Sequence, residues 1–217
     1  MSNVSIIGIG RLGLCFGLTL EKSGFHVCGL DIINEYVESI NSKSLFSYEP
    51  DVNELLSKST NFVATTNINR CVDHADIIFV TVASYSEPDG RYDVSQVDSV
   101  VSSLKSLGRQ PKRKHLVICT NVNPGYTDTI YQDLKDYNWE VSFNPETVAQ
   151  GTILKNQSAP DCVYIGSDTL ALAKEVENVY ETVCTNIPSF HIMDRLSAEL
   201  TKVSLNCFLT CKISFAN

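Results

Sequence analysis

The chain has 217 residues, 43% of them hydrophobic, so it can bury the core of one large domain. Its 17 Lys and Arg against 25 Asp and Glu give a formal net charge of -8 without a long basic run, which argues against a nucleic-acid partner. The first residues lack a signal-peptide pattern and no apolar run is long enough to span a bilayer, so we expect a cytoplasmic protein without a membrane partner.

Short apolar runs rich in Val and Ile alternate with helix-like segments along the first 190 residues. Strands are predicted at residues 4–8, 26–31, 61–64, 76–82, 115–120, 140–143 and 162–165. Helices are predicted at residues 12–23, 34–41, 97–106, 127–137 and 170–182. This alternation predicts an α/β, Rossmann-like fold: a parallel sheet with helices on both faces.

A glycine-rich turn follows the first predicted strand and opens the first predicted helix. Gly8 allows a tight turn, Gly10 lets a diphosphate approach the backbone, and Gly13 lets the helix pack closely on the strand. Asp31, at the end of the second strand, can accept hydrogen bonds from an adenosine ribose and would repel a 2'-phosphate, which favours NAD over NADP. The alternative is a glycine turn that serves packing alone. The cofactor contacts predicted here are Gly8, Ile9, Gly10, Arg11, Leu12, Gly13, Asp31 and Tyr36.

One long helix is predicted from Asp194 onward. Its apolar positions include Leu196, Leu200, Val203, Phe208 and Ile213. So much apolar surface needs partners on several sides, which predicts packing against more protein or a homodimer through this helix. Glu199, Lys202 and Asn206 are spaced three and four apart and form one polar stripe. The stripe is either a functional site or, alternatively, a solvated face or an ordinary ion pair between Glu199 and Lys202.

Four segments beyond the glycine turn carry motifs in a fixed order. They run Val82-Ala-Ser-Tyr-Ser-Glu-Pro-Asp-Gly90, Thr120-Asn-Val-Asn-Pro-Gly125, Asn144-Pro-Glu-Thr-Val-Ala-Gln-Gly151 and Ala198-Glu-Leu-Thr-Lys-Val-Ser-Leu-Asn206. In these segments, and in Ala159-Pro-Asp-Cys-Val-Tyr-Ile-Gly166, the chain resembles the UDP-glucose/GDP-mannose dehydrogenase family.

The resemblance implies an NAD-dependent oxidoreductase that converts the C6 alcohol of a nucleotide sugar to a carboxylate, with UDP-glucose favoured. Lys202 would stabilise the developing oxyanion together with Asn206, and Glu146 would take part in proton transfer with an ordered water. Asn121 stands where the family has a Thr that positions water. The implied substrate contacts are Glu146, Thr147, Val148, Ala149, Lys202 and Asn206. The further implied cofactor contacts are Val82, Ala83, Ser84, Thr120, Asn121, Val122 and Gln150.

The expected organisation is an NAD-binding Rossmann-type domain over residues 1–193 and the beginning of a central helix over residues 194–217. The family's nucleophilic cysteine belongs to a Gly-Gly-x-Cys-x-x-Lys motif downstream of the central helix, and none of the eight cysteines has that context. The chain ends where the family would continue into its second domain, which holds much of the nucleotide-base contact surface. We therefore expect the chain to bind NAD without completing the oxidation. The scattered cysteines predict reduced, mostly buried side chains and no metal site.

Some residues depart from the family pattern: Gln150 replaces a Glu that approaches the cofactor, and Thr147-Val148 replaces Phe-Leu. Two alternatives stay open. A β-hydroxyacid or 6-phosphogluconate-type dehydrogenase shares the glycine turn and a Lys-x-x-x-Asn pair on a long helix, but does not explain the Asn144-Pro-Glu146 sequence. The other is a truncated, non-catalytic NAD-binding or oligomerisation module, which reading the gene beyond Asn217 would distinguish from an enzyme.

Overall fold

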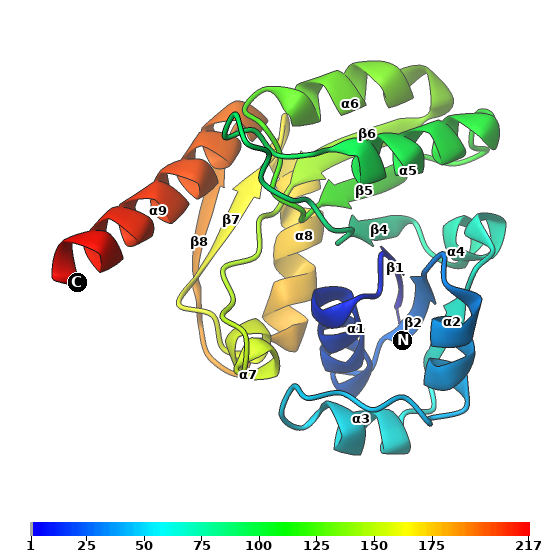
Figure 1. Cartoon of the computed structure of the whole chain (residues 1–217). Helices are drawn as coiled ribbons and strands as arrows, with labels where there is room; N and C mark the ends of the chain where they lie inside the picture. Colours follow the sequence, from blue (N-terminus) through cyan, green and yellow to red (C-terminus); the bar gives the residue numbers. More distant parts are fainter. Residues whose placement is uncertain (1) are drawn as a thin grey trace.

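The computed structural model describes residues 2–217, in which the apolar runs pair into one eight-stranded sheet (Figure 1). The strands are β1 (Asn3–Ile7), β2 (His26–Leu30), β3 (Phe62–Thr65), β4 (Ile77–Val80), β5 (Lys114–Ile118), β6 (Trp139–Phe143), β7 (Cys162–Gly166) and β8 (Ser189–Met193). Their order is β3-β2-β1-β4-β5-β6-β7-β8. Neighbouring strands are parallel except β6 and β7, which share one antiparallel pair, Phe143 with Gly166. The Rossmann-like fold class is confirmed, with this one antiparallel junction in an otherwise parallel sheet.

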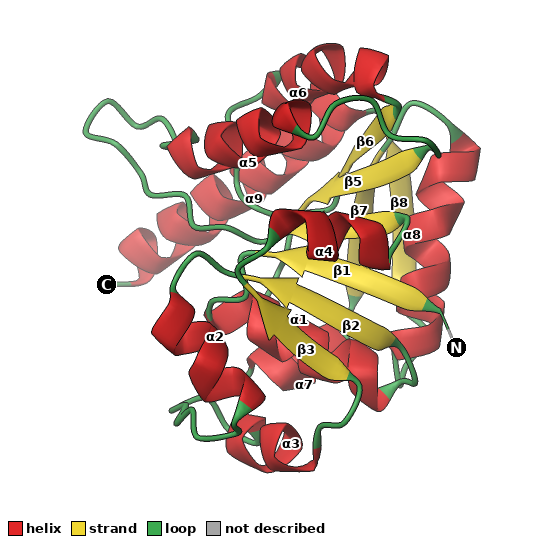
Figure 2. Cartoon of the chain, turned by 90° about the vertical axis from the view of Figure 1, so that its right-hand side faces the viewer, coloured by secondary structure: helices red, strands yellow, loops and turns green. Residues whose placement is uncertain are grey.

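Helices cover both faces of the sheet (Figure 2). They are α1 (Arg11–Lys22), α2 (Asn34–Asn41), α3 (Val52–Lys58), α4 (Ile68–His74), α5 (Ser95–Ser106), α6 (Tyr126–Leu134), α7 (Ile153–Ser158), α8 (Leu170–Val183) and α9 (Arg195–Ala216), with a short 3-10 helix, Lys135–Tyr137, after α6. One apolar cluster joins α1, α2, α3, α7 and α8 to the sheet, and a second joins α4, α5 and α6 to the other face. Across residues 2–217, no helix combines the length and apolar composition needed to cross a membrane.

Four short elements were missed by the sequence prediction: α3, α4, α7 and β8. The three helices have six or seven residues each, too few for a helical period to stand out. Strand β8 lies at the edge of the sheet, and its residues are exposed or half-buried, so it lacks the continuous apolar run of a central strand.

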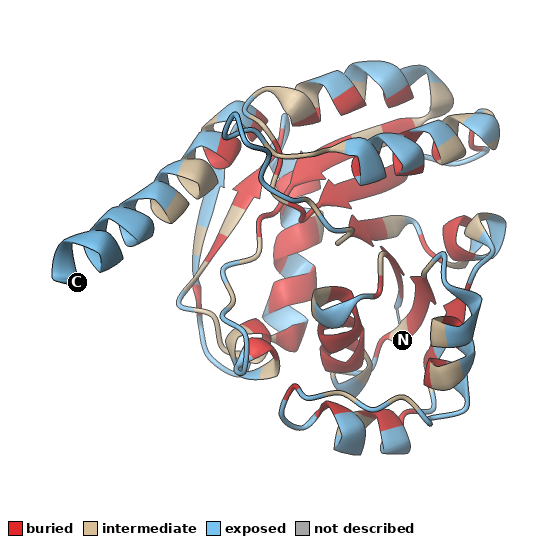
Figure 3. Ribbon diagram, in the orientation of Figure 1, coloured by how far each residue is buried: buried red, intermediate tan, exposed pale blue. Residues whose placement is uncertain are grey.

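Helix α9 docks its first turns on the sheet and then projects from it (Figure 1). Arg195 is buried, with Nε 2.6 Å from Asp128 Oδ1 and Nη1 2.7 Å from Asp168 Oδ2. The small Gly166 of β7 lets the helix approach closely. From residue 207 onward every side chain is exposed (Figure 3), including Phe208 at 60% and Phe215 at 95%. Within the described chain, four of the apolar positions predicted on this helix are exposed, namely Leu196, Leu200, Phe208 and Ile213, whereas Val203 is half-buried.

Replacing Gly166 with Ala tests this docking. The added Cβ would lie 2.8 Å from Ala198 Cβ and 2.9 Å from Arg195 Cα, so the backbone of α9 must shift. We expect the free energy of unfolding to fall by about 1–3 kcal/mol. Urea denaturation followed by circular dichroism measures it, and a midpoint equal to that of the unmodified chain would contradict the close approach.

Candidate functional site

The carboxyl ends of β1, β2 and β4 meet at the glycine turn. Gly8 has φ +89°, and a Cβ there would lie 2.7 Å from the backbone nitrogen of Val82. A Cβ on Gly13 would lie 2.2 Å from the carbonyl oxygen of Gly8. Gly10 differs from both, because no described atom would lie within 4 Å of its Cβ. Packing thus explains Gly8 and Gly13, whereas the open space at Gly10 suits the close approach of a ligand.

The groups around Gly10 fit a dinucleotide. Gly10 is the N-cap of α1, so the free amides of the helix's first turn point at the open space, where a diphosphate is favoured. Tyr36 Oη donates to the carbonyl of Ile9 at 2.9 Å and steadies the turn. Asp31 follows β2 directly, is half-buried, and accepts one hydrogen bond from the amide of Ile33 at 3.2 Å. Its second oxygen can accept from a ribose hydroxyl. Arg11, the first residue of α1, is exposed.

Two further turns extend this edge of the sheet, after β4 and β5. Thr120 Oγ1 donates to the carbonyl of Val82 at 2.6 Å, which ties the two turns together. Ala83 is exposed and its amide donates to Gln96 Oε1 at 3.1 Å. The structure places the remaining predicted residues of these turns at the same edge: Ser84 and Asn121 are half-buried, and Val122 is buried.

Lys202 and Glu146 are brought together from distant parts of the chain. Lys202 Nζ donates to the backbone carbonyl of Glu146 at 2.7 Å. Burial raises the pKa of the Glu146 carboxyl to about 7, while a hydrogen bond from Gln157 and the charge of Lys202 oppose this rise. Burial lowers the pKa of the Lys202 ammonium, and the Glu146 charge opposes that shift. A carboxyl that titrates near neutrality beside an ammonium has the properties of an acid-base pair.

The polar stripe of α9 divides between two sites. Glu199 is 1% exposed and accepts from the amides of Gly125 at 2.5 Å and Thr127 at 2.8 Å, and from the Thr127 hydroxyl. Glu199 therefore binds the amino end of α6. The alternative of an ordinary ion pair between Glu199 and Lys202 is wrong, because Lys202 bonds to Glu146 instead. Asn206 Nδ2 lies 3.3 Å from the hydroxyl of Tyr92.

The segment after Glu146 reaches the first turns of α1. Thr147 and Ala149 are exposed and Val148 is half-buried. Gln150 lines a cavity of about 460 Å³ together with Arg11, Tyr36 and Glu49, so the structure places it beside the predicted cofactor residues. Glu49 is buried and accepts from the amides of Gly151 at 3.0 Å and Ile153 at 2.8 Å, which holds this segment in place.

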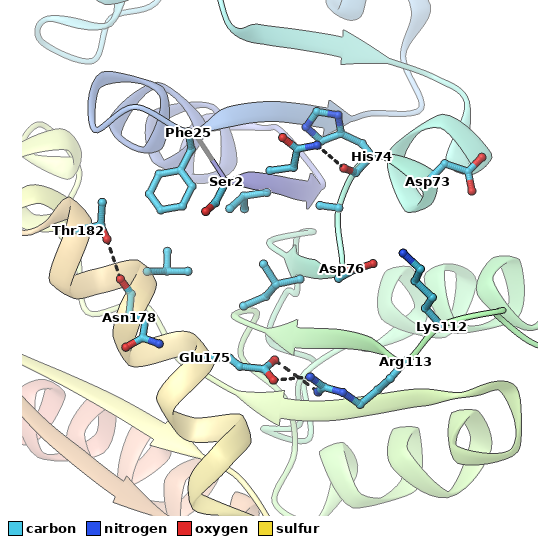
Figure 4. Close-up of a pocket in the computed structure, with 15 residues that line it drawn as sticks. Ser2, Phe25, Asp73, His74, Asp76, Lys112, Arg113, Glu175, Asn178 and Thr182 are labelled. Carbon is cyan, nitrogen blue, oxygen red and sulfur yellow. Dashed lines mark hydrogen bonds and ion pairs between the residues drawn. The ribbon is translucent and has the colours of Figure 1, made fainter.

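A larger cavity, of about 680 Å³, lies at the opposite end of the strands, near the amino ends of β1, β4 and β5 (Figure 4). Glu175 forms an ion pair with Arg113 there, and its other oxygen is 2.9 Å from His115 Nδ1. Burial opposes ionisation of Glu175, but the bonds to His115 and Arg113 outweigh it and lower its pKa to about 2. Arg113 and His115 are both hydrogen-bond partners of Glu175, and none of the predicted site residues lines this cavity.

Tyr92 and Gln157 contact predicted site residues, and Glu49 lines the same cavity as Gln150, but all three were missed from the sequence. Glu49 reaches amides 102 and 104 positions away, and Tyr92 reaches a residue 114 positions away. Residue patterns within one segment do not predict contacts between residues so far apart in the sequence. Gln157 offered one signal, a polar residue on the buried side of a short helix, but α7 itself was not predicted.

Comparison with known proteins identifies the relatives. The model of the UDP-glucose/GDP-mannose dehydrogenase family, NAD binding domain, matches residues 2–184. An uncharacterized Methanocaldococcus jannaschii protein, MJ1054, is 33% identical over 99% of this chain and 24% of its own length. UDP-glucose 6-dehydrogenase YwqF of Bacillus subtilis is 28% identical over 99% of this chain and 50% of its own. The structure of a UDP-glucose dehydrogenase from Pyrobaculum islandicum superimposes with a TM-score of 0.90 and 26% identity, over all of this chain and 52% of that one.

The chain thus spans about half the length of the two dehydrogenases and about a quarter of the M. jannaschii protein. Its glycine turn, its exposed Gly10 and the carboxylate at the end of β2 fit the cofactor named by the matching family model. The chain belongs to the UDP-glucose/GDP-mannose dehydrogenase family and comprises that family's NAD-binding domain.

Proposed function

We propose that the chain is the NAD-binding half of a nucleotide-sugar dehydrogenase that oxidises the C6 alcohol of UDP-glucose towards UDP-glucuronate. The observation that carries the proposal is the meeting of Lys202 and Glu146 at the edge of the sheet that bears the glycine turn. The family model names UDP-glucose and GDP-mannose, and the names of the B. subtilis and P. islandicum relatives support UDP-glucose.

In the proposed reaction each side chain has one task. NAD, when bound, supplies the hydride acceptor. Lys202 stabilises negative charge that develops on the substrate oxygen, and Asn206 donates to the same oxygen. Glu146 accepts the alcohol proton directly or through water, for which a pKa of about 7 is well matched. Asn121 orients that water from the turn after β5. Thr147, Val148 and Ala149 line the sugar pocket.

We propose that residues 1–193 form the NAD-binding domain and that residues 194–217 form the beginning of a central helix. The complete four-electron oxidation then depends on a second, nucleotide-binding domain with a thiol nucleophile, in keeping with the half-length match to the relatives. The exposed apolar side chains of α9 support a homodimer through this helix. The proposed partners are a nucleotide sugar and a second subunit, and the proposed location is the cytoplasm.

Calorimetry with NAD, NADP and UDP-glucose tests ligand preference in this chain. We expect NAD to bind, and NADP to bind at least roughly tenfold more weakly because its 2'-phosphate would approach the Asp31 carboxylate. UDP-glucose alone should bind weakly or undetectably. Equal affinity for NAD and NADP would contradict the proposed role of Asp31.

The Gly10→Ala variant separates ligand binding from folding. Its Cβ meets no described atom within 4 Å, so thermal stability should stay close to that of the unmodified chain, while the methyl group blocks the diphosphate and weakens NAD binding at least tenfold. Gly13→Ala is the matched control, because its Cβ would clash with the Gly8 carbonyl and lower stability as well. If Gly10→Ala bound NAD as tightly as the unmodified chain, the proposed approach of the diphosphate to Gly10 would be wrong.

An activity assay on the full-length protein tests the reaction. NADH absorbance should rise with UDP-glucose, and Lys202→Met should lower the rate by at least roughly a hundredfold because it removes the oxyanion's positive partner. The rate should fall as the pH drops below about 7, since protonation removes the Glu146 base. Reduction of NAD by a hydroxyacid phosphate in place of UDP-glucose would favour the rival dehydrogenase class.

Sedimentation velocity tests the proposed dimer. The chain should self-associate as its concentration rises, and replacing Phe208 and Ile213 with Ser should favour the monomer, because both side chains are more than half exposed on α9. A stable monomer at every concentration would contradict the proposal.

A further inference from the structure

Gln157 of α7 is a buried polar side chain next to the Glu146 carboxyl group. It is 2% exposed, and its Nε2 atom lies 3.3 Å from Glu146 Oε1. The same nitrogen lies 3.3 Å from the backbone carbonyl of Leu12, in the first turn of α1. One amide group therefore connects the carboxyl group to the helix that begins at the glycine turn.

The two acceptors fix the orientation of the amide. A primary amide nitrogen carries two hydrogens, which matches the carbonyl of Leu12 and the carboxylate of Glu146 one for one. Turning the amide over would place its oxygen against two other oxygen atoms. The donor face of Gln157 is thus directed at Glu146 by a backbone group that cannot titrate.

The amide oxygen of Gln157 behaves differently from its nitrogen. It is buried and has no hydrogen-bond partner among residues 2–217. A buried acceptor without a partner destabilises a fold, and an apolar side chain of similar size would avoid that cost. Packing alone therefore does not account for a glutamine at this position.

Lys202 is the charged neighbour of Glu146 on α9, where burial holds down its own pKa. The other titratable groups near Glu146 are Cys15 of α1, Cys119 after β5 and Tyr180 of α8. Burial raises the pKa of all three, so they are neutral near pH 7. Two neighbours therefore favour the charged form of Glu146: Gln157 donates a side-chain hydrogen bond to it, and Lys202 supplies a positive charge.

We propose that Gln157 is a positioning residue that holds the Glu146 carboxylate in its charged form at a fixed place beside α1. The significance for catalysis rests on the proposed role of Glu146 as the base. The effect on Glu146 itself does not depend on that role.

Carbon-13 NMR titration of the glutamate carboxyl carbons tests the proposal on the chain without ligand. The Glu146 signal is assigned by its loss in Glu146→Gln. In Gln157→Leu we expect Glu146 to bind its proton about threefold to tenfold more tightly, which moves the midpoint upward from about 7. Gln157→Met, unbranched like glutamine, should give the same shift and decides the question if the Leu variant does not fold.

Asn156→Ala is the matched control. Asn156 is the neighbour of Gln157 on α7, and its Oδ1 accepts from the amide of Ala149 at 3.1 Å and the Thr152 hydroxyl at 2.8 Å, so it supports the same segment without bonding to Glu146. An upward shift in the Gln157 variants alone supports the proposal. An unchanged midpoint in a folded Gln157 variant, or an equal shift in Asn156→Ala, overturns it.

Cofactor calorimetry on the unmodified chain keeps the two ideas separate. If the unmodified chain binds no NAD but the Gln157 variants show the upward shift of the Glu146 midpoint, the proposed function is contradicted and the role of Gln157 is supported. If the unmodified chain binds NAD but the Gln157 variants show no shift, the proposed function keeps its support and the role of Gln157 is overturned.

Discussion

Glu199 places a buried carboxylate at the amino end of α6, where it accepts two backbone amide bonds and a hydroxyl bond. A carboxylate removed from water is stable only if such donors replace its hydration, and the positive end of a helix dipole adds to them. The bonds fix the rotation and height of α9 against the turn after β5. Lys202 and Asn206 stand on the same helix, so this attachment, together with the Arg195 ion pairs, sets their positions beside Glu146 and Tyr92.

Three glutamates reach this edge of the sheet and serve different ends because their surroundings differ. Glu199 and Glu49 each accept two backbone amides and fasten one chain segment to another. Glu146 receives a single long bond from Gln157, and burial raises its pKa to about 7. A well-satisfied carboxylate is a structural anchor, whereas a poorly satisfied one can exchange a proton near neutral pH. The same side chain thus anchors the chain at two places and has a pKa near neutrality at the third.

Local patterns predicted much of the fold, because buried strands and the glycine turn are encoded by neighbouring residues. Gly8, Gly10, Gly13 and Asp31 lie at one edge as predicted, since parallel strands bring their carboxyl ends together. The polar stripe on α9 was predicted from spacing alone, but spacing could not reveal that Glu199 faces α6 while Lys202 faces another loop. Contacts such as that of Gln157 arise from packing between distant segments, and a single sequence carries no direct record of them.

The junction of β6 and β7 has a mechanical consequence. A single backbone pair joins β7 and β8 to the other six strands, and the neighbouring Asn144 adds side-chain bonds across the junction. Its Nδ2 donates to the Tyr164 carbonyl at 2.8 Å, and its Oδ1 accepts from the Tyr180 hydroxyl at 2.8 Å. Asn144 lies two residues before Glu146, so these bonds hold the backbone next to Glu146 against β7 and α8. A side chain, rather than a ladder of backbone hydrogen bonds, therefore anchors the start of the segment that carries the Glu146 carboxyl group.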